Sequence, residues 1–352
     1  MKRQVYLCLL LCISVAGTAA CEGGTQADSD NASLVEVVDK YKKGMYEEAF
    51  AHVNEIIEND PENALAYYNR GLLYTQWGEN DKAMSDYTSA ITLNPQIDLA
   101  YNNRGLMHFD AGQYEKALSD FNNAIQCSPN RAILYHNRGL TYSATGSTTE
   151  AVNDFTKAIA INPLYVKSYI GRASVYAGMK DYDNALNDYT QALTIDPRNS
   201  LVHMGKGDIC MALNKVDDAH AAYTSAIEAN PKSALAYSNR GVAEYKKSNI
   251  EESLSDYSKA IQIDPNIFFV YHNRGVSYYK KKDYDKAIAD YSKAVDLNPQ
   301  FAEAYYNRGV AYSVKKKFDA CKEDLDKAMQ LGYRVPARLL KLLDTYYKKK
   351  KQ

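Results

Sequence analysis

The sequence contains few of the residues that mark several protein classes. Its 352 residues include six Cys, one Trp and nine Pro. Six Cys are far too few for the dense disulfide framework of small secreted domains. The formal net charge is −1, so the chain as a whole lacks the positive charge that draws proteins to nucleic acids. With 46% hydrophobic and 24% charged residues, the composition excludes a collagen, a disordered tail and a polytopic membrane protein.

Long hydrophobic runs are also absent, except at the amino terminus. Lys2 and Arg3 precede residues 5–20, which carry no charge and end in small residues. A helix of that length would extend about 24 Å, which is short of the roughly 30 Å hydrocarbon core of a membrane. We therefore expect residues 1–20 to be a secretory signal peptide.

Residues 18–21, Thr-Ala-Ala-Cys, resemble the lipobox of bacterial lipoproteins, with Thr18 where that family has Leu. The resemblance implies cleavage behind Ala20 and acylation of Cys21, which would anchor the chain to a membrane of the cell envelope that faces the periplasm or the exterior. The alternative is plain cleavage, which leaves Cys21 as an unpaired thiol and the protein secreted. Residues 21–33 are small, polar and acidic, and they are predicted to be a flexible tether.

Proline recurs every 34 residues, at positions 61, 95, 129, 163, 197, 231, 265 and 299. Eight repeats of this length occupy residues 64–335, and we number the sites of each repeat from its first residue. Site 4 is Tyr in seven repeats and His203 in the fifth, and site 8 is Gly in seven repeats and Ala173 in the fourth. Site 24 is aromatic in seven repeats, and site 27 is Ala in all eight. The chain is therefore an array of one structural unit.

Within each repeat, two groups of sites follow the helical period. Sites 4, 8 and 11 share one helical face, and so do sites 20, 24 and 27. Each repeat is therefore expected to be a pair of amphipathic helices, with small residues at sites 8 and 20 where the helices approach closely. Between the two helices, Gly78, Gly112 and Gly146 suit the left-handed conformation of a helix C-terminus.

The repeat length and the aromatic, Gly, Ala and Pro sites resemble the tetratricopeptide repeat family over residues 64–335. The resemblance implies an all-α fold, a right-handed superhelical solenoid of eight helix pairs with a concave groove lined by the first helices. Residues 34–63 look like a degenerate repeat that caps the amino-terminal end, with Ala49 at the small site. Residues 336–352 are predicted to be a capping helix and a basic tail. Four leucines of that helix are expected to cover the last pair: Leu339, Leu340, Leu342 and Leu343.

Sites 7 and 23 change together. Site 7 is Arg and site 23 is Asp in seven repeats, whereas the fifth repeat has Lys206 and Ala222. The joint exception predicts that these side chains pair across the helix packing, where the forked guanidinium holds a carboxylate through two bonds that Lys cannot make. Substrate binding by the same residues is the alternative. The predicted structural pairs are Arg70 and Asp86, Arg104 and Asp120, Arg138 and Asp154, Arg172 and Asp188, Arg240 and Asp256, Arg274 and Asp290, and Arg308 and Asp324.

Site 6 is Asn in six repeats and Gly in the fourth and fifth. On the resemblance, this site faces the groove, and its carboxamide holds the backbone amides of a bound peptide. The alternative is that each Asn binds water or a neighbouring helix. Gly171 and Gly205 interrupt the row, and together with Gly207 and His203 they predict a softer middle over residues 166–233. The six predicted groove residues are Asn69, Asn103, Asn137, Asn239, Asn273 and Asn307.

Charge is unevenly spread along the chain. Residues 234–352 hold 23 Lys and Arg against 15 Asp and Glu, whereas residues 21–233 hold 17 against 28. Lysines recur at the end of the first helix of the last three repeats, and they predict a basic ridge for an anionic polymer or an acidic protein. The alternative is an ordinary solvated helix end, where Lys suits the helix dipole. The ridge residues are Lys246, Lys247, Lys280, Lys281, Lys282, Lys315, Lys316 and Lys317.

The side chains that most often bind metals or act in catalysis are scattered over different sites of the repeats. The six His and the Cys of the repeats fall at different sites, and no arrangement of a metal site or a catalytic group emerges. We therefore expect no enzyme activity, no cofactor, no metal and no nucleic-acid partner. The sequence favours a membrane-tethered scaffold or adaptor lipoprotein that binds proteins or extended peptides in its groove. The alternative is an envelope assembly factor that docks a secretion, pilus or wall-synthesis machine through its basic ridge and convex surface, without a peptide ligand.

Overall fold

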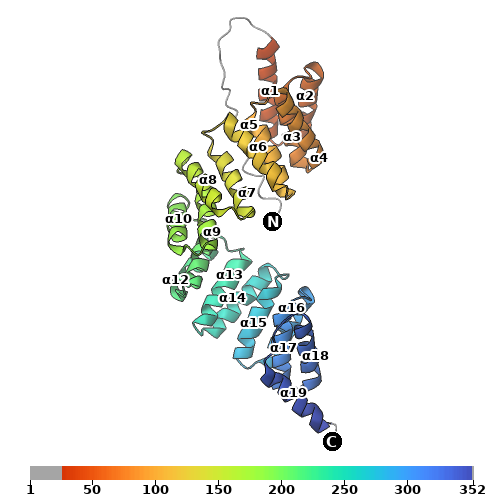
Figure 1. Cartoon of the computed structure of the whole chain (residues 1–352), viewed down its shortest axis with the longest axis vertical. Helices are drawn as coiled ribbons and strands as arrows, with labels where there is room; N and C mark the ends of the chain where they lie inside the picture. The colour runs from red at the N-terminus through yellow and green to blue at the C-terminus, as the bar shows by residue number, and fades with distance from the viewer. Residues whose placement is uncertain (1–25, 351–352) are drawn as a thin grey trace. The chain divides into compact units, whose positions relative to one another are not determined.

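The computed structural model describes residues 26–350, and these residues form α-helices joined by short turns, with no strand among them (Figure 1). They fall into two compact units that divide between Pro129 and Asn130. The predicted signal peptide and Cys21 lie outside the described residues. None of the described helices has both the length and the apolar character needed to cross a membrane.

The helices alternate in chain order as the first and second members of each pair. The amino-terminal unit contains α1 (Gln26–Lys42), α2 (Tyr46–Asn59), α3 (Ala64–Trp77), α4 (Asn80–Leu93), α5 (Asp98–Asp110) and α6 (Tyr114–Cys127). The first three pairs of the carboxy-terminal unit are α7 (Ala132–Ala144) and α8 (Thr148–Ile161), α9 (Val166–Gly178) and α10 (Tyr182–Ile195), and α11 (Ser200–Ala212) and α12 (Val216–Ala229). Its remaining helices are α13 (Ala234–Lys246), α14 (Ile250–Ile263), α15 (Phe268–Lys280), α16 (Tyr284–Leu297), α17 (Ala302–Val314), α18 (Phe318–Gln330) and α19 (Ala337–Lys350).

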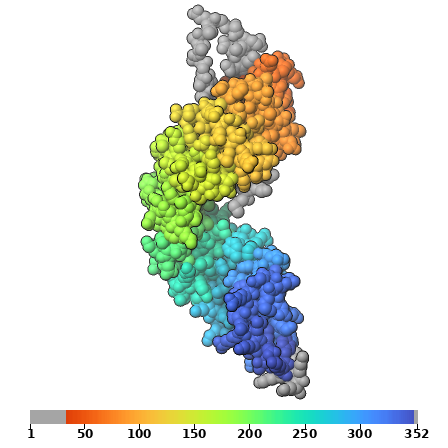
Figure 2. Space-filling model, viewed as in Figure 1, coloured from red at the N-terminus to blue at the C-terminus, as the bar shows by residue number. Residues whose placement is uncertain are grey.

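Each predicted repeat is one helix pair, from α3 and α4 to α17 and α18, which confirms a helix-pair repeat fold. Within each unit a pair packs against its neighbours in the sequence, so the colour changes steadily along each unit in the space-filling view (Figure 2). Such stacking buries a continuous core that no single pair could bury alone. The eight Ala residues of site 27 illustrate this, since all are fully buried: Ala90, Ala124, Ala158, Ala192, Ala226, Ala260, Ala294 and Ala328.

The glycines of site 8 make room for the aromatic rings of site 24. A Cβ on Gly71 would lie 2.7 Å from Cε1 of Tyr87, which is closer than carbon atoms pack. In the fourth repeat Ala173 takes the glycine site, and there the ring of Tyr189 contacts Gly205 of the next repeat instead. The volumes of the two sites are therefore complementary, as close packing requires.

The turn between the two helices has the same backbone conformation in every repeat. Gly78, Gly112 and Gly146 adopt φ values of 77°, 73° and 81°, which confirms the prediction for these glycines. In the last five repeats the same site is also left-handed, although it carries a side chain that disfavours this conformation. These residues are Lys180, Asn214, Ser248, Lys282 and Lys316, with φ between 57° and 67°.

The amino-terminal pair differs from the prediction in one respect. Helix α1 begins at Gln26, so residues 26–33 are helical rather than a flexible tether. Helix extension costs little once a turn is nucleated, and the turn that holds Leu34 and Val37 is packed into the core. Val37 and Val53 occupy the sites of the usual Gly and aromatic residue, and both are buried, at 1% and 0% exposure.

The carboxy-terminal helix α19 covers the last pair with three of its four predicted leucines. Leu343 is 5% exposed, and Leu339 and Leu340 pack against the same cluster, which includes Val335. The expectation for Leu342 is wrong, because this side chain is 45% exposed. Successive helical residues point about 100° apart, so Leu342 lies off the face that holds Leu339 and Leu343.

Candidate functional site

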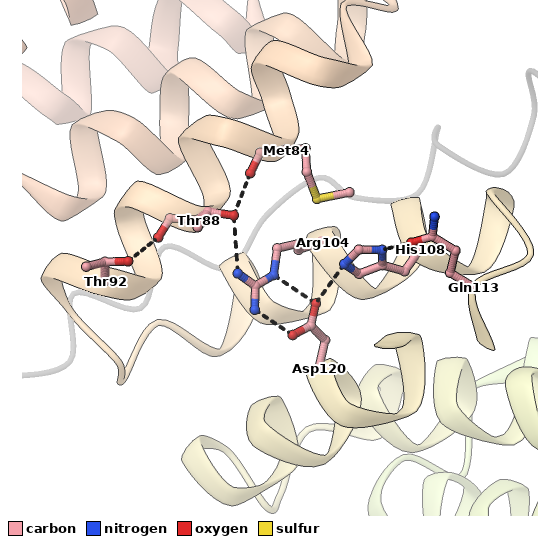
Figure 3. Close-up of polar contacts among 7 residues, drawn as sticks. All are labelled: Met84, Thr88, Thr92, Arg104, His108, Gln113 and Asp120. Carbon is pink, nitrogen blue, oxygen red and sulfur yellow. Dashed lines mark hydrogen bonds and ion pairs between the residues drawn. The ribbon is translucent and has the colours of Figure 1, made fainter. Parts of the chain in front are cut away.

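All seven predicted Arg and Asp pairs form in the structure. In each pair the arginine Nε donates to Oδ2 of the aspartate and Nη2 donates to Oδ1, over 2.7 to 2.9 Å. The arginine lies on the first helix and the aspartate on the second helix of one repeat, as Arg104 and Asp120 show (Figure 3). The aspartate side chains are at most 9% exposed, so each guanidinium neutralises a buried charge.

A third contact extends six of the seven pairs to the preceding repeat. Nη1 of Arg104 donates to Oγ1 of Thr88, 3.2 Å away on α4, and this hydroxyl donates in turn to the carbonyl of Met84 (Figure 3). One guanidinium therefore joins three helices. Sequence reasoning missed this residue at site 25, although the signal was present, because the site is polar in each repeat. The matching acceptors of the other arginines are Asn54, Thr156, Thr224, Ser258 and Ser292.

Tyrosine rings also lie over the guanidinium groups of six of the seven arginines. The Cζ atom of Arg104 lies 5.8 Å from the centroid of Tyr101, which is within the range of a cation–π contact. The hydrogen bonds that Arg104 donates to Asp120 raise the pKa of Arg104 above its ordinary value, and burial opposes this shift. With both carboxylate oxygens and a neighbouring hydroxyl engaged, the arginines hold the repeats together, and the geometry gives no support to substrate binding by them.

The fifth repeat replaces the Arg and Asp pair with a different network. Asp208 lies at site 9 of α11, and its Oδ1 accepts hydrogen bonds from Oη of Tyr223 at 2.7 Å and from Nδ2 of Asn239 at 3.0 Å. Partial burial raises the pKa of the Asp208 carboxyl, while the two hydrogen bonds lower it. The Asn239 bond links α11 to α13, the first helix of the next repeat.

The asparagines of site 6 are largely engaged within the chain. Nδ2 of Asn69 donates to the carbonyl of Leu65 at 2.7 Å, and Nδ2 of Asn307 lies 2.8 Å from Nε2 of His272. Asn103 and Asn137 are 4% and 7% exposed. Oδ1 of Asn273 lies 3.3 Å from Nδ1 of His272. The contacts of Asn307 and Asn239 reach a neighbouring first helix, as the alternative expects, whereas those of Asn69 and Asn273 stay within their own helix.

Aromatic rings fill the space beside the two glycines that interrupt this row of asparagines. A Cβ on Gly171 would lie 2.7 Å from the ring of Phe155, and one on Gly205 would lie 2.6 Å from Cζ and Oη of Tyr189. Both rings belong to the second helix of the preceding repeat. The missing asparagines therefore reflect the packing between repeats, and the interruption is not a gap in the core.

Ion pairs with the preceding repeat neutralise part of the basic ridge. Nζ of Lys247 lies 2.9 Å from Asp217 and that of Lys281 lies 2.6 Å from Glu251, and Lys315 pairs with Asp285 in the same way. Exposed pairs of this kind contribute about 0.2 to 1 kcal/mol each. The other ridge residues are exposed: Lys246, Lys280, Lys282, Lys316 and Lys317.

The cysteines of the repeats are packed as small apolar residues. Cys210 and Cys321 are buried, and Cys127 is half-buried with its thiol against the carbonyl of Pro95. Burial raises the pKa of Cys321 to about 11, so its thiol stays protonated and unreactive at neutral pH. Within residues 26–350, no group of three or more metal-ligating side chains comes together.

Apolar side chains remain exposed at site 2 of several first helices. Leu65, Leu201 and Leu235 are 43%, 70% and 42% exposed. Leu99 and Phe269, at the same site of other repeats, are half-buried. Leu65 lies in the amino-terminal unit, and Leu201 and Leu235 lie on successive first helices of the carboxy-terminal unit. Exposed leucines on equivalent helices are typical of a surface that binds another molecule.

Comparison with known proteins finds repeated matches to one family. Models described as tetratricopeptide or TPR repeats match residues 64–163 and 176–331, which together exceed half of the chain. A stretch of 51 residues is 41% identical to stress-induced-phosphoprotein 1 of Caenorhabditis elegans and covers 14% of this chain. That match spans only 16% of the length of the relative.

Solved structures share the fold at low sequence identity. A tetratricopeptide repeat protein from Parabacteroides merdae is 22% identical, with a TM-score of 0.55, over 71% of this chain and 99% of that chain. PilF of Pseudomonas aeruginosa is 19% identical, with a TM-score of 0.54, over 60% of this chain and 96% of that chain. A chain of the APC/C hetero-tetramer Cut9–Hcn1 is 18% identical, with a TM-score of 0.57, over 91% of this chain and 63% of that chain. The helix pairs, the conserved packing geometry from repeat to repeat and the family matches lead to one conclusion: this chain belongs to the tetratricopeptide repeat family.

Proposed function

We propose that this protein is a scaffold that holds protein partners or extended peptides on the first helices of its repeats. The observation that carries the proposal is the exposure of leucines at site 2, Leu65 in the amino-terminal unit and Leu201 and Leu235 in the carboxy-terminal unit. The repeats themselves are held together by the buried Arg and Asp pairs, so these leucines are not needed to join them. Exposed apolar side chains on a rigid framework gain free energy when a partner covers them.

The tether is a separate part of the proposal. Cys21 would carry the lipid that holds the scaffold to a membrane of the cell envelope, as the residues around it suggest. Tetratricopeptide proteins are typically non-catalytic, and we extend this to the present chain. Replacing Cys21 by Ala should release the protein into the soluble envelope fraction, whereas retention in membranes after a high-salt wash would contradict lipid anchoring.

Partner capture tests the exposed leucines. Full-length protein is purified from detergent-solubilised membranes, and its bound proteins are identified by mass spectrometry. A triple variant, Leu65→Ser with Leu201→Ser and Leu235→Ser, should lose specific partners. The control is Leu164→Ser, since Leu164 is 72% exposed but lies in the turn before α9. The same partners on the triple variant and on the parent protein would contradict the proposal.

The basic ridge supports a second candidate, docking to an anionic partner in envelope assembly. The favouring observation is that Lys280, Lys316 and Lys317 are exposed without an ion pair to any described residue. Reversing these three to Glu should weaken such docking and reduce its dependence on salt. Binding that is unchanged by reversal but lost in the leucine variant would leave the scaffold as the function.

A further inference from the structure

Asp208 is the only charged residue at site 9 of the eight repeats. The other seven are apolar or a small hydroxyl: Leu72, Leu106, Leu140, Ser174, Val242, Val276 and Val310. Asp208 as a whole residue is exposed on α11, although its carboxyl is partly buried by its neighbours. Its carboxylate takes part in the contact between α11 and α13, and its charge has no counterpart at the equivalent sites of the other repeats.

The carboxylate is held in a defined orientation. Both hydrogen bonds, from Tyr223 and from Asn239, go to Oδ1. In the first repeat the corresponding tyrosine hydroxyl bonds Thr75 at site 12, but the fifth repeat has Met211 there, so the hydroxyl of Tyr223 turns to Asp208. For Oδ2 the described residues supply no hydrogen bond. One oxygen is therefore fixed and the other remains an acceptor.

Exposed leucines flank this acceptor. Leu201 and Asp208 are seven residues apart on α11, so they share one face of the helix. Leu235 takes the same place on α13, where Asn239 makes the bond to Asp208. We call Leu201, Asp208, Leu235 and Asn239 the Asp208 surface. Between Leu201 and Asp208, the ring of Tyr189 occupies the place where a side chain on residue 205 would lie.

We propose that the Asp208 surface binds an extended segment that carries a Lys or Arg with an apolar residue three positions away. The proposal rests on the scaffold function and specifies its ligand. A charge-assisted bond to a cation is the strongest contact that the remaining carboxylate oxygen can make.

The spacing follows from helix and strand geometry. Seven helical residues span about 10 Å, which an extended peptide covers in about three residues. The cation of the ligand would then contact Oδ2 of Asp208 while the apolar side chain covers Leu201 or Leu235.

The test uses random twelve-residue peptide pools with fixed central residues. One pool has a central Lys with Leu three positions to either side, and two matched pools have Glu or Gln in place of that Lys. Immobilised full-length protein should retain the Lys pool at least tenfold more than the Glu pool. Asp208→Asn keeps the acceptor for Tyr223 and Asn239, so the fold persists, yet the preference for Lys should disappear. Asp183→Asn, an exposed change on α10, is the control and should keep it.

The outcomes separate this proposal from the scaffold function. Equal retention of the Lys and Glu pools, or a preference that survives in Asp208→Asn, overturns the proposal for Asp208. If peptides still bind in those cases and are lost in Leu201→Ser with Leu235→Ser, the scaffold function stands. If no pool is retained and the leucine variants keep every partner from membranes, both fail.

Discussion

The fifth repeat and the other seven differ in where they place an acidic side chain and in how they pair it. Seven repeats bury an aspartate at site 23 and neutralise it with an arginine, whereas the fifth has Ala222 there and Lys206 opposite. Its acid lies instead on the first helix, where Tyr223 and Asn239 donate to Asp208. The difference teaches that the buried acid is kept only where a guanidinium can reach it, because an unpaired buried charge costs more than the pair contributes.

The largest effect is expected from breaking one pair. Arg274→Leu leaves Asp290, which is 6% exposed, without its cation. We expect a loss of about 3 kcal/mol in the free energy of unfolding. Because repeat arrays open locally, the loss should appear as faster hydrogen exchange in α15 and α16.

A matched double variant sharpens the comparison. Arg274→Lys with Asp290→Ala reproduces the combination of the fifth repeat, and it removes the charge together with its partner. It should recover more than half of the lost stability, since replacing both partners is far cheaper than removing one. A double variant as unstable as Arg274→Leu would show that the pair contributes more than neutralisation.

The second effect concerns site 5, which is His136 in the third repeat and Met204 in the fifth. His136 is 6% exposed, lies 3.2 Å from Oγ of Ser168, and is packed against Tyr165. Burial lowers the pKa of His136 to about 4, and the charge of Lys167 adds to this shift.

The sign of the pH dependence follows from that direction. The folded state favours the neutral ring of His136. The contribution of this ring to the free energy of unfolding is therefore complete above the unfolded pKa of about 6.5 and is lost as the pH falls toward 4. Between pH 7 and pH 5 the parent protein should lose about 2 kcal/mol around α7 and α9. His136→Met, which copies the fifth repeat, should remove this dependence. Equal loss in both proteins, measured by hydrogen exchange at the two pH values, would assign it to other groups.

A third effect tests the glycines of the fourth and fifth repeats. Gly205→Ala places a Cβ 2.6 Å from Tyr189, and overpacking of this kind costs about 1 to 3 kcal/mol. Gly178→Ala is the control, because nothing lies within 4 Å of its Cβ, and it should stabilise α9 by about 0.5 kcal/mol. If Gly205→Ala increases the stability instead, the packing at this site tolerates a Cβ. Residues 166–233 are then locally less stable because of their glycines, as the sequence predicts.

The repeated features were predictable from the sequence because each occurs many times in the same place. The joint change of Lys206 and Ala222 was enough to predict the Arg and Asp pairs before any distance was known. The hydrogen-bond partners of the site 6 amides were not predictable, because they depend on neighbouring residues that differ between repeats. Asn307 meets His272, whereas Asn239 meets Asp208.

Single departures were harder to interpret than repeated sites. The sequence assigned no role to Asp208, since an acidic residue on a helix is ordinary unless its site is known to be mostly apolar. The hydroxyls of site 25 were overlooked for a different reason. Their partner lies one repeat away, and the helical period of a single repeat contains no information on contacts between repeats.

The smallest effect concerns the turns, where the first three repeats have Gly and the last five do not. Lys282 and Lys316 hold φ values of 67° and 58°, a conformation that costs a residue with a side chain about 1 kcal/mol relative to Gly. Replacing either by Gly removes this strain but also makes the unfolded chain more flexible, so the net gain should be about 0.5 kcal/mol. Lys280→Gly, two residues before Lys282 at the end of α15, should destabilise instead, because there the backbone is helical. Urea midpoints of the three variants would decide the matter: a loss at Lys282 and Lys316 as large as at Lys280 would mean that these lysines stabilise the turn by contacts that outweigh its strain.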